Sequence, residues 1–342
     1  MPGLSPTAIQ DLVASTLRDL GPMRMTLNAT DLRDFPVMQD MLKKDKVAFD
    51  GGIGIERSIW TERGNSVKQT KLHGEDSVSI VDVIKKVRAE WKYTTFSYAW
   101  ERRELLHNRG NGKKILDLIK LRRNIAMLDL AHHWEDQFWT LADPADDEAI
   151  NGLPFWVVKN ATEGLNGGTP VGYSTAPGGL EHPKWKNHTF TYKAITKIDA
   201  LAAMRRAGRA TRFKSPISIQ DFRSGTGARF KIFVNYNTVD EMEMLLEEQN
   251  DNLGTDLWKY DGSPTFRKSP IIAVDKLNAD TTDPIYMLDM SQFYPVFLEG
   301  DYMTETEPTW LQGRHNTLVV NGDCTVNWLC NDRRVQAVGY RN

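Results

Sequence analysis

The hydrophobic positions near the start of the chain recur at helical spacing over residues 6–20. Ser5 and Pro6 match a helix N-cap followed by proline at the first helical position, and Gly21-Pro22 ends the pattern. Residues 21–42 show no sustained period, which predicts an extended arm. A short amphipathic helix on such an arm has to bury its apolar side against the protein's own body or against a neighbour.

Residues 43–80 are polar, rich in glycine and partly alternating, which predicts a long hairpin-like loop with its turn at 63–66. The loop has too few apolar residues to form a core of its own. A loop of this length is uncommon in a compact monomer unless it is functional. Better alternation over residues 85–100 predicts a strand.

The strongest pattern follows Gly112. No glycine or proline occurs between Lys113 and Asp143, and the apolar residues recur on one helical stripe. The pattern predicts a helix of about 30 residues, which would be about 45 Å long. The apolar stripe contains Leu116, Ile119, Met127, Leu130, Trp134, Phe138 and Leu141, and it is widened by Leu118, Leu121, Ile125 and Leu128.

The rest of the chain mixes loops, strands and helices. Residues 144–195 are rich in proline and glycine, but Trp156 and Trp185 between them favour an ordered, anchored loop. The fold class is therefore α+β. The further elements predicted are helices at 199–209 and 239–248 and strands at 230–234, 270–274, 285–289, 294–298, 317–329 and 335–338.

Composition and charge exclude several classes of protein. The 342 residues carry 43 Lys and Arg against 45 Asp and Glu, a net charge of -2, which argues against a dedicated nucleic-acid-binding protein. No apolar run approaches the roughly 20 residues that span a bilayer, and the N-terminus does not match a secretory signal. Cys324 and Cys330 fit neither a disulfide framework nor a common zinc motif.

Motifs for catalysis are sparse. No phosphate loop, dinucleotide fingerprint or nucleophile elbow occurs, so no catalytic residue and no cofactor is predicted. One cluster could bind a metal, since His132 and Asp136 lie one helical turn apart beside His133 and Glu135. The favoured alternative is a polar face near the end of the long helix, where the helix dipole stabilises histidine.

Two groups of arginines form a candidate basic face: Arg122 and Arg123 on the long helix, and Arg205, Arg206 and Arg209 on the helix at 199–209. A solvated face, or an ion-pair partner for the acidic helix at 240–248, is the simpler interpretation. The alternative is a surface that faces nucleic acid or an acidic neighbour.

Several segments occur in an order known from one family. They are YAWERRELLHN at 98–108 before the long helix, INGLPFWVV at 150–158, WKN at 185–187, FVN at 233–235 leading to EM at 241–242, and QNDNLG at 249–254. Together with the order of the elements, they resemble the major capsid proteins of tailed double-stranded DNA bacteriophages, which share the Hong Kong 97-type fold. The resemblance extends over nearly the whole chain.

The resemblance implies a division of the chain. It gives an N-terminal arm (1–42), an extended β-hairpin loop (43–80), a peripheral domain (81–195 and 317–342) that holds the spine helix (about 111–142) and the Pro/Gly/Trp loop, and an axial domain (196–316). The arm and the loop would lie across neighbouring subunits. The implied inter-subunit contacts are Arg57, Trp60, Arg63, Lys68, Trp156 and Trp185, and Lys46, Lys68 and Lys71 are candidate donors for a covalent cross-link.

The resemblance also implies a function. The protein would assemble with itself into hexamers and pentamers of an icosahedral or prolate phage head that encloses double-stranded DNA, with portal, scaffolding and decoration proteins as partners. DNA contact would be non-specific, no membrane would be involved, and the location would be the virion after assembly in the host cytoplasm. Met1 at the start favours a separate scaffolding protein. The alternatives are an encapsulin-like shell protein and a metal-dependent enzyme that uses His132, His133, Glu135 and Asp136.

Overall fold

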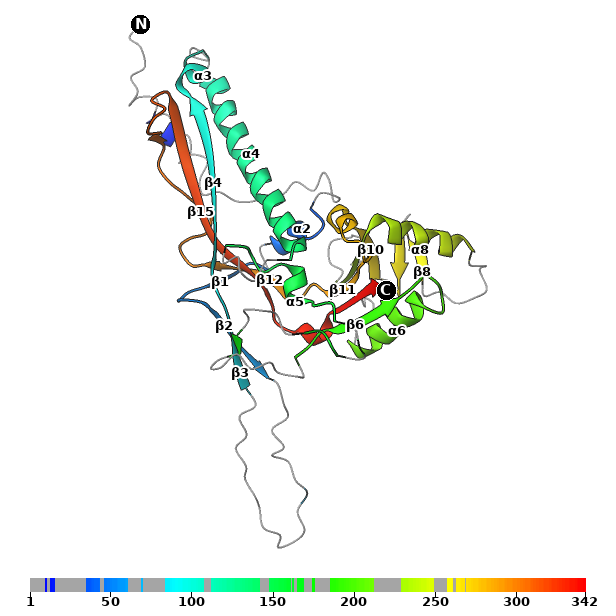
Figure 1. The fold of residues 1–342 in the computed structure, drawn as a ribbon. Coiled ribbons are helices and arrows are strands. Elements are labelled where there is room, and N and C mark those ends of the chain that lie inside the picture. Colours follow the sequence, from blue (N-terminus) through cyan, green and yellow to red (C-terminus); the bar gives the residue numbers. More distant parts are fainter. Residues whose placement is uncertain are drawn as a thin grey trace.

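Two sheets and one long helix form the body of the protein in its computed structural model (Figure 1). Most of the helix predicted over 6–20, together with Arg63, Lys68 and Lys71, lies outside the described residues. The structure describes residues 10, 13–15, 35–43, 46–60, 69, 84–107, 112–141, 148–160, 162, 165–168, 174–175, 185–211, 229–248, 257–260, 263–267 and 269–342.

The longest strands pair beside the long helix. β4 (Lys92–Glu101) is antiparallel to β15 (Thr317–Cys330) over ten residue pairs, and α4 (Gly112–Trp139) packs against β4, which confirms the predicted long helix (Figure 1). The side chains of β4 alternate between buried and exposed, as expected where only one face of a strand is covered. The six-stranded sheet is completed by β12 (Phe293–Leu298), β1 (Ala48–Asp50), β13 (Thr304–Glu305) and β14 (Thr309–Trp310).

A seven-stranded sheet forms the second lobe. Its central strand β7 (Phe230–Val234) is buried at every residue because both faces of the sheet are covered. On one face, α6 (Ala200–Ala210) packs on β6 and β16 at one end of the sheet, and α8 (Tyr236–Glu248) packs on β8, β9 and β10 at the other end. The strand order is β6 (His188–Tyr192), β16 (Ala337–Arg341), β11 (Ile285–Asp289), β7, β10 (Ser269–Ala273), β9 (Ser263–Phe266) and β8 (Leu257–Tyr260).

The other face of this sheet joins the first lobe. Trp139, the last residue of α4, has its ring centroid 5.4 Å from that of Phe233 and 6.4 Å from that of Tyr286. Phe138 packs on Trp328 of β15 at 6.4 Å. One hydrophobic core therefore extends from the six-stranded sheet, past the C-terminal end of α4, to the seven-stranded sheet.

The two sheets divide the chain differently from the predicted domains. β12 falls within the predicted axial range 196–316 but pairs with β15 of the six-stranded sheet. β6 and β16 fall within the predicted peripheral ranges but pair with each other, and β16 pairs with β11, in the seven-stranded sheet. The reason is that a strand joins a sheet through hydrogen bonds to segments that are distant in the chain. The order of the strands along the sequence does not show which strands pair.

A small third sheet projects from the body (Figure 1). β2 (Ile55–Trp60) pairs antiparallel with β3 (Ile84–Ala89), which pairs with β5 (Ser174–Thr175). The single strand predicted over 85–100 is therefore two strands, because β3 returns along the hairpin before β4 begins. Short helical segments are α2 (Met38–Met41), α3 (Arg102–His107), α5 (Leu153–Trp156), η1 (Asp275–Ala279) and η2 (Arg333–Val335). None of the helices in the described residues is both long and apolar enough to cross a bilayer.

Candidate assembly surfaces

Three apolar side chains on α4 are exposed in a row, here named the α4 stripe. Leu121, Ile125 and Leu128 are 56%, 48% and 48% exposed, and their spacing of four and three residues places them on one side of the helix. The apolar stripe predicted on this helix is therefore not buried throughout, since Leu141 is exposed as well. An exposed row of large apolar residues is typical of an interaction site. The inward side of α4 is formed by Ile119, Leu130, Trp134 and Phe138.

A groove of about 470 Å³ lies on the adjacent side of α4. One wall is β4 from Tyr93 to Ser97, and the other wall is α4 with Asp129, His133 and Gln137. Tyr93 is largely exposed at this groove. Its lining combines the aromatic residues Tyr93 and Phe96 with polar and small apolar residues, which suits a peptide segment better than a buried small molecule.

The histidine and carboxylate cluster on α4 does not converge on one point. His132 stacks on Phe35 at 4.4 Å between ring centroids, while the Asp136 carboxylate pairs with Lys276 at 2.7 Å. Glu135 points into the protein and is buried. Among the described residues, no group of three or more His, Cys, Asp or Glu side chains is arranged to hold a metal ion.

Glu135 instead holds the end of the N-terminal arm. Its carboxylate accepts a hydrogen bond from the backbone N–H of Met38 at 2.8 Å and another from Trp139 Nε1 at 2.7 Å. Burial raises the pKa of Glu135 to about 7, although these hydrogen bonds favour the charged form. Burying this carboxylate, which fixes the N-terminal end of α2, therefore disfavours its charged form.

A second carboxylate fixes the other end of α2. Asp40 contacts the ammonium groups of Lys43, Lys46 and Lys231, the last at 3.1 Å from β7. Burial on its own would raise the pKa of Asp40, but the three ammonium groups outweigh it and hold the pKa well below its usual range. The sequence analysis gave no sign of this cluster, because its members lie far apart in the chain and match no motif.

Arg57 is the one predicted contact residue of the extended loop whose side chain is described. Its guanidinium donates to Asp50 at 2.6 Å and to the Tyr294 hydroxyl at 3.3 Å, so it ties the hairpin to β1 and β12. The hydrogen bond from Arg57 lowers the pKa of Asp50. Trp60 ends β2, and the structure describes its backbone but not its side chain.

Trp156 and Trp185 are buried inside the subunit, at 0% and 4% exposure. They therefore offer no surface for the inter-subunit contacts expected of them. Their backbone carbonyls accept hydrogen bonds from Arg333, whose guanidinium carbon also lies 5.2 Å from the centroid of the Trp185 ring. Arg333 was not predicted to matter, since nothing in the sequence separates it from its neighbour Arg334.

The candidate basic face divides into two kinds of arginine. Arg122 pairs with Glu104 at 2.8 Å, and Arg123 is buried and pairs with Glu305, so the long helix presents no continuous basic surface here. The other three lie on α6, where Arg206 and Arg209 are exposed and Arg205 is half-buried.

No protein-family model and no curated protein sequence matches the chain. Solved structures do match it over nearly its whole length. The capsid asymmetric unit of cyanophage A-1(L) has a TM-score of 0.57 at 15% identity, covering 92% of this chain and 94% of that one. The protein has a capsid fold.

Two further matches agree with this fold. The capsid of the empty GTA particle gives a TM-score of 0.56 at 10% identity, and that of the native GTA particle gives 0.52 at 9%; each covers 94% of this chain and 93% of the other. The α+β, Hong Kong 97-type architecture expected from the sequence is thereby confirmed.

Proposed function

We propose that the protein is the major capsid protein of a tailed phage, a self-assembling subunit of an icosahedral or prolate head that encloses double-stranded DNA. The observation that carries the proposal is the match to the cyanophage capsid chain, which extends over nearly all of both chains. A shared fold alone is an argument by analogy. The surface features of this chain support the proposal independently.

The supporting surfaces are the α4 stripe, the groove beside α4 and the projecting β2–β3 hairpin. A free monomer gains nothing from exposing an apolar row or a hairpin that stands away from the body. In a shell, many copies of a modest interface act together, so each such surface adds to a large total affinity. We assign the α4 stripe to contact with a second copy of the chain.

The remaining expectations belong to the same proposal. Hexamers and pentamers would form the head, portal, scaffolding and decoration proteins would join it, and contact with the packaged DNA would be non-specific. The protein would reside in the virion after assembly in the host cytoplasm.

Electron microscopy of the purified full-length protein, alone and with co-expressed scaffolding protein, tests the proposal. The expected result is closed shells, or rings of five and six subunits. A chain that stays monomeric at all concentrations and with all such partners would contradict the proposal.

Ile125→Asp tests the α4 stripe. Ile125 is half-exposed, so the added charge should leave the free energy of unfolding nearly unchanged while it places a carboxylate in an apolar contact. The expected result is loss of shells with an unchanged melting temperature. The control Lys120→Gln lowers the net charge by the same one unit at an exposed position that is not three or four residues from any stripe residue, and it should assemble. Normal assembly of Ile125→Asp would remove the stripe from the interface.

An encapsulin-like shell protein is the alternative within the same fold. The two are separated by the contents of particles purified from the native source, since a phage head holds double-stranded DNA and an encapsulin holds cargo enzymes. The metal-dependent enzyme is disfavoured, because the His132, Glu135 and Asp136 side chains point to different partners.

A further inference from the structure

Two helices of opposite charge lie over opposite ends of the seven-stranded sheet. α6 carries three arginines and no acidic residue, and it covers the end formed by β6 and β16. α8 carries five acidic residues and no basic residue, and it covers the end formed by β10, β9 and β8. In Figure 1, α6 lies beside β6, and α8 lies beside β8 and β10. The charges of the lobe are therefore separated from one end to the other.

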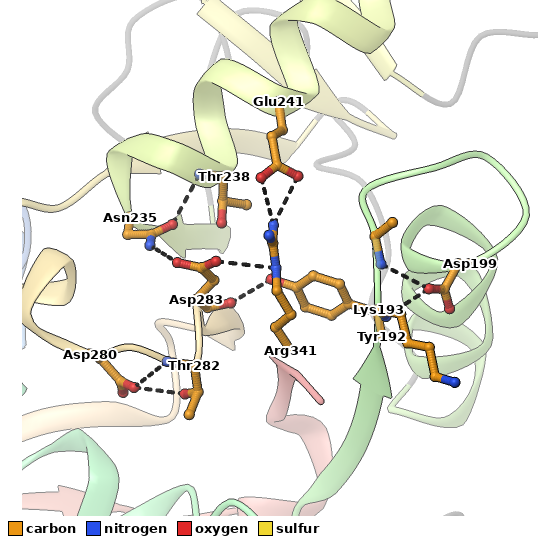
Figure 2. Close-up of polar contacts among 11 residues, drawn as sticks. Tyr192, Lys193, Asp199, Asn235, Thr238, Glu241, Asp280, Thr282, Asp283 and Arg341 are labelled. Carbon is orange, nitrogen blue, oxygen red and sulfur yellow. Dashed lines mark hydrogen bonds and ion pairs between the residues drawn. The ribbon is translucent and has the colours of Figure 1, made fainter.

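Among the described residues, two acidic groups near these helices already have partners inside the subunit. Glu241 of α8 is taken by Arg341, whose Nη2 lies 2.7 and 2.8 Å from the two carboxylate oxygens (Figure 2). Asp199, the acidic residue before α6, accepts hydrogen bonds from the backbone N–H groups of Lys193 and Ala194 and is thereby turned toward its own loop (Figure 2).

Four charged side chains on the two helices remain for other partners. Arg206 and Arg209 are exposed on α6, and Asp240 is exposed and Glu243 half-buried on α8. Within the described part of the chain, none of the four has an ion-pair partner. For these four side chains, the pairing of the basic helix with the acidic helix, one of the alternatives raised by the sequence, is absent among the described residues.

We infer that α6 of one subunit docks against α8 of the next, so that the seven-stranded lobes associate head to tail with a second copy of this chain. The inference rests on the proposed shell function and names the surface that builds its rings. Contact of α6 with α6, or of α8 with α8, would bring like charges together, which costs several kcal/mol in a close interface. The contact therefore joins two different surfaces, and such heterologous contacts close into rings when the rotation between subunits permits.

Charge reversal on each helix tests the pairing. The first variant is R206E/R209E, which makes α6 acidic at these two positions, and the second is D240K/E243K, which makes α8 basic at these two positions. These side chains are exposed or half-buried, so each variant should remain folded by circular dichroism. Each alone is expected to lose rings in native mass spectrometry and electron microscopy. The matched control carries all four substitutions, which keeps the net charge of -2 and restores opposite charges, and it should form rings again.

Mixing the two variants gives a sharper readout. In the mixture, the α6 with R206E/R209E meets the α8 with D240K/E243K, and the unmodified α6 meets the unmodified α8. The two variants therefore have to alternate around a ring. An alternating ring closes only with an even number of subunits. The mixture is therefore expected to form rings of six and none of five, whereas the four-substitution control forms whatever rings the unmodified protein forms.

The outcomes separate this inference from the proposed function. If the unmodified protein assembles and either reversed variant assembles equally well, the pairing of α6 with α8 is wrong and the shell function stands. Failure of the four-substitution control to assemble, although folded, also counts against the pairing. If the unmodified protein never assembles, with or without scaffolding protein, it is the shell function that fails.

Discussion

Arg333 provides the sharpest test of how the loop after α4 is held. Its side chain is fully buried, and its guanidinium donates to the carbonyl oxygens of Trp156 at 2.5 Å, Trp185 at 3.2 Å and Gly168 at 2.5 Å and to Asn187 Oδ1 at 3.0 Å. All four acceptors lie in the Pro/Gly/Trp loop, while Arg333 follows the long strand β15. Arg333→Met keeps the length of the side chain and removes all its donors.

The expected loss of stability follows from the buried oxygens that lose the Arg333 donor. Asn187 Oδ1 keeps the hydrogen bond that it accepts from the Val158 N–H at 3.1 Å. Each of the three carbonyl oxygens left without the Arg333 donor costs about 1–3 kcal/mol, so together they cost at least about 3 kcal/mol. Burial of the methionine side chain recovers about 2 kcal/mol or less, because the cavity was shaped for a polar group. We therefore expect Arg333→Met to lower the free energy of unfolding by about 3 kcal/mol, a large part of the 5–15 kcal/mol typical of a folded domain.

Urea unfolding of unassembled subunits, followed by tryptophan fluorescence, measures this loss. Limited proteolysis adds a local readout, since cleavage within the Pro/Gly/Trp loop should become faster. The matched control is Arg334→Met at the adjacent position, where the guanidinium is 39% exposed and pairs with Asp332. Its loss should stay below about 1 kcal/mol. Equal losses in the two variants, or a loss below about 1 kcal/mol for Arg333→Met, would refute the reasoning.

Two further substitutions test local features of the fold. Burial raises the pKa of Glu135 from 4.5 to about 7. Between these pH values, the folded state holds a proton that the unfolded state has released. The free energy of unfolding therefore falls as the pH rises from about 4.5 to about 7, by about 3 kcal/mol in total. The free energy of unfolding at pH 5 and pH 8 should therefore fall more for the unmodified protein than for Glu135→Gln, and equal changes would contradict the assignment. In Gly322→Ala, the new Cβ would lie 2.1 Å from Phe96 Cζ, so this ring has to move, and we expect a loss of about 1–3 kcal/mol in the same urea assay. Gly51→Ala is its control, with no atom within 4 Å of the new Cβ, and a loss as large there would refute the packing argument.

The local elements, and through the resemblance the fold, could be predicted from the sequence. The absence of glycine and proline between Lys113 and Asp143 leaves helix as the favoured backbone state, and α4 occupies Gly112–Trp139. The run at 230–234 likewise became β7. Such predictions succeed because helix and strand periodicity depend on residues that are close together in the chain.

The tertiary structure alone decided which apolar and charged groups are available to partners. α4 has apolar residues on more than one side, and only the packing of β4 and β15 on one side leaves Leu121, Ile125 and Leu128 exposed on another. The same holds for the arginines. Arg123 is buried and forms an ion pair with Glu305, whereas Arg206 is exposed and has no ion-pair partner among the described residues. The physical reason is that burial depends on contacts between segments that are far apart in the chain. A periodic pattern shows only that a side chain is apolar or charged, and it does not show which segment covers that side chain.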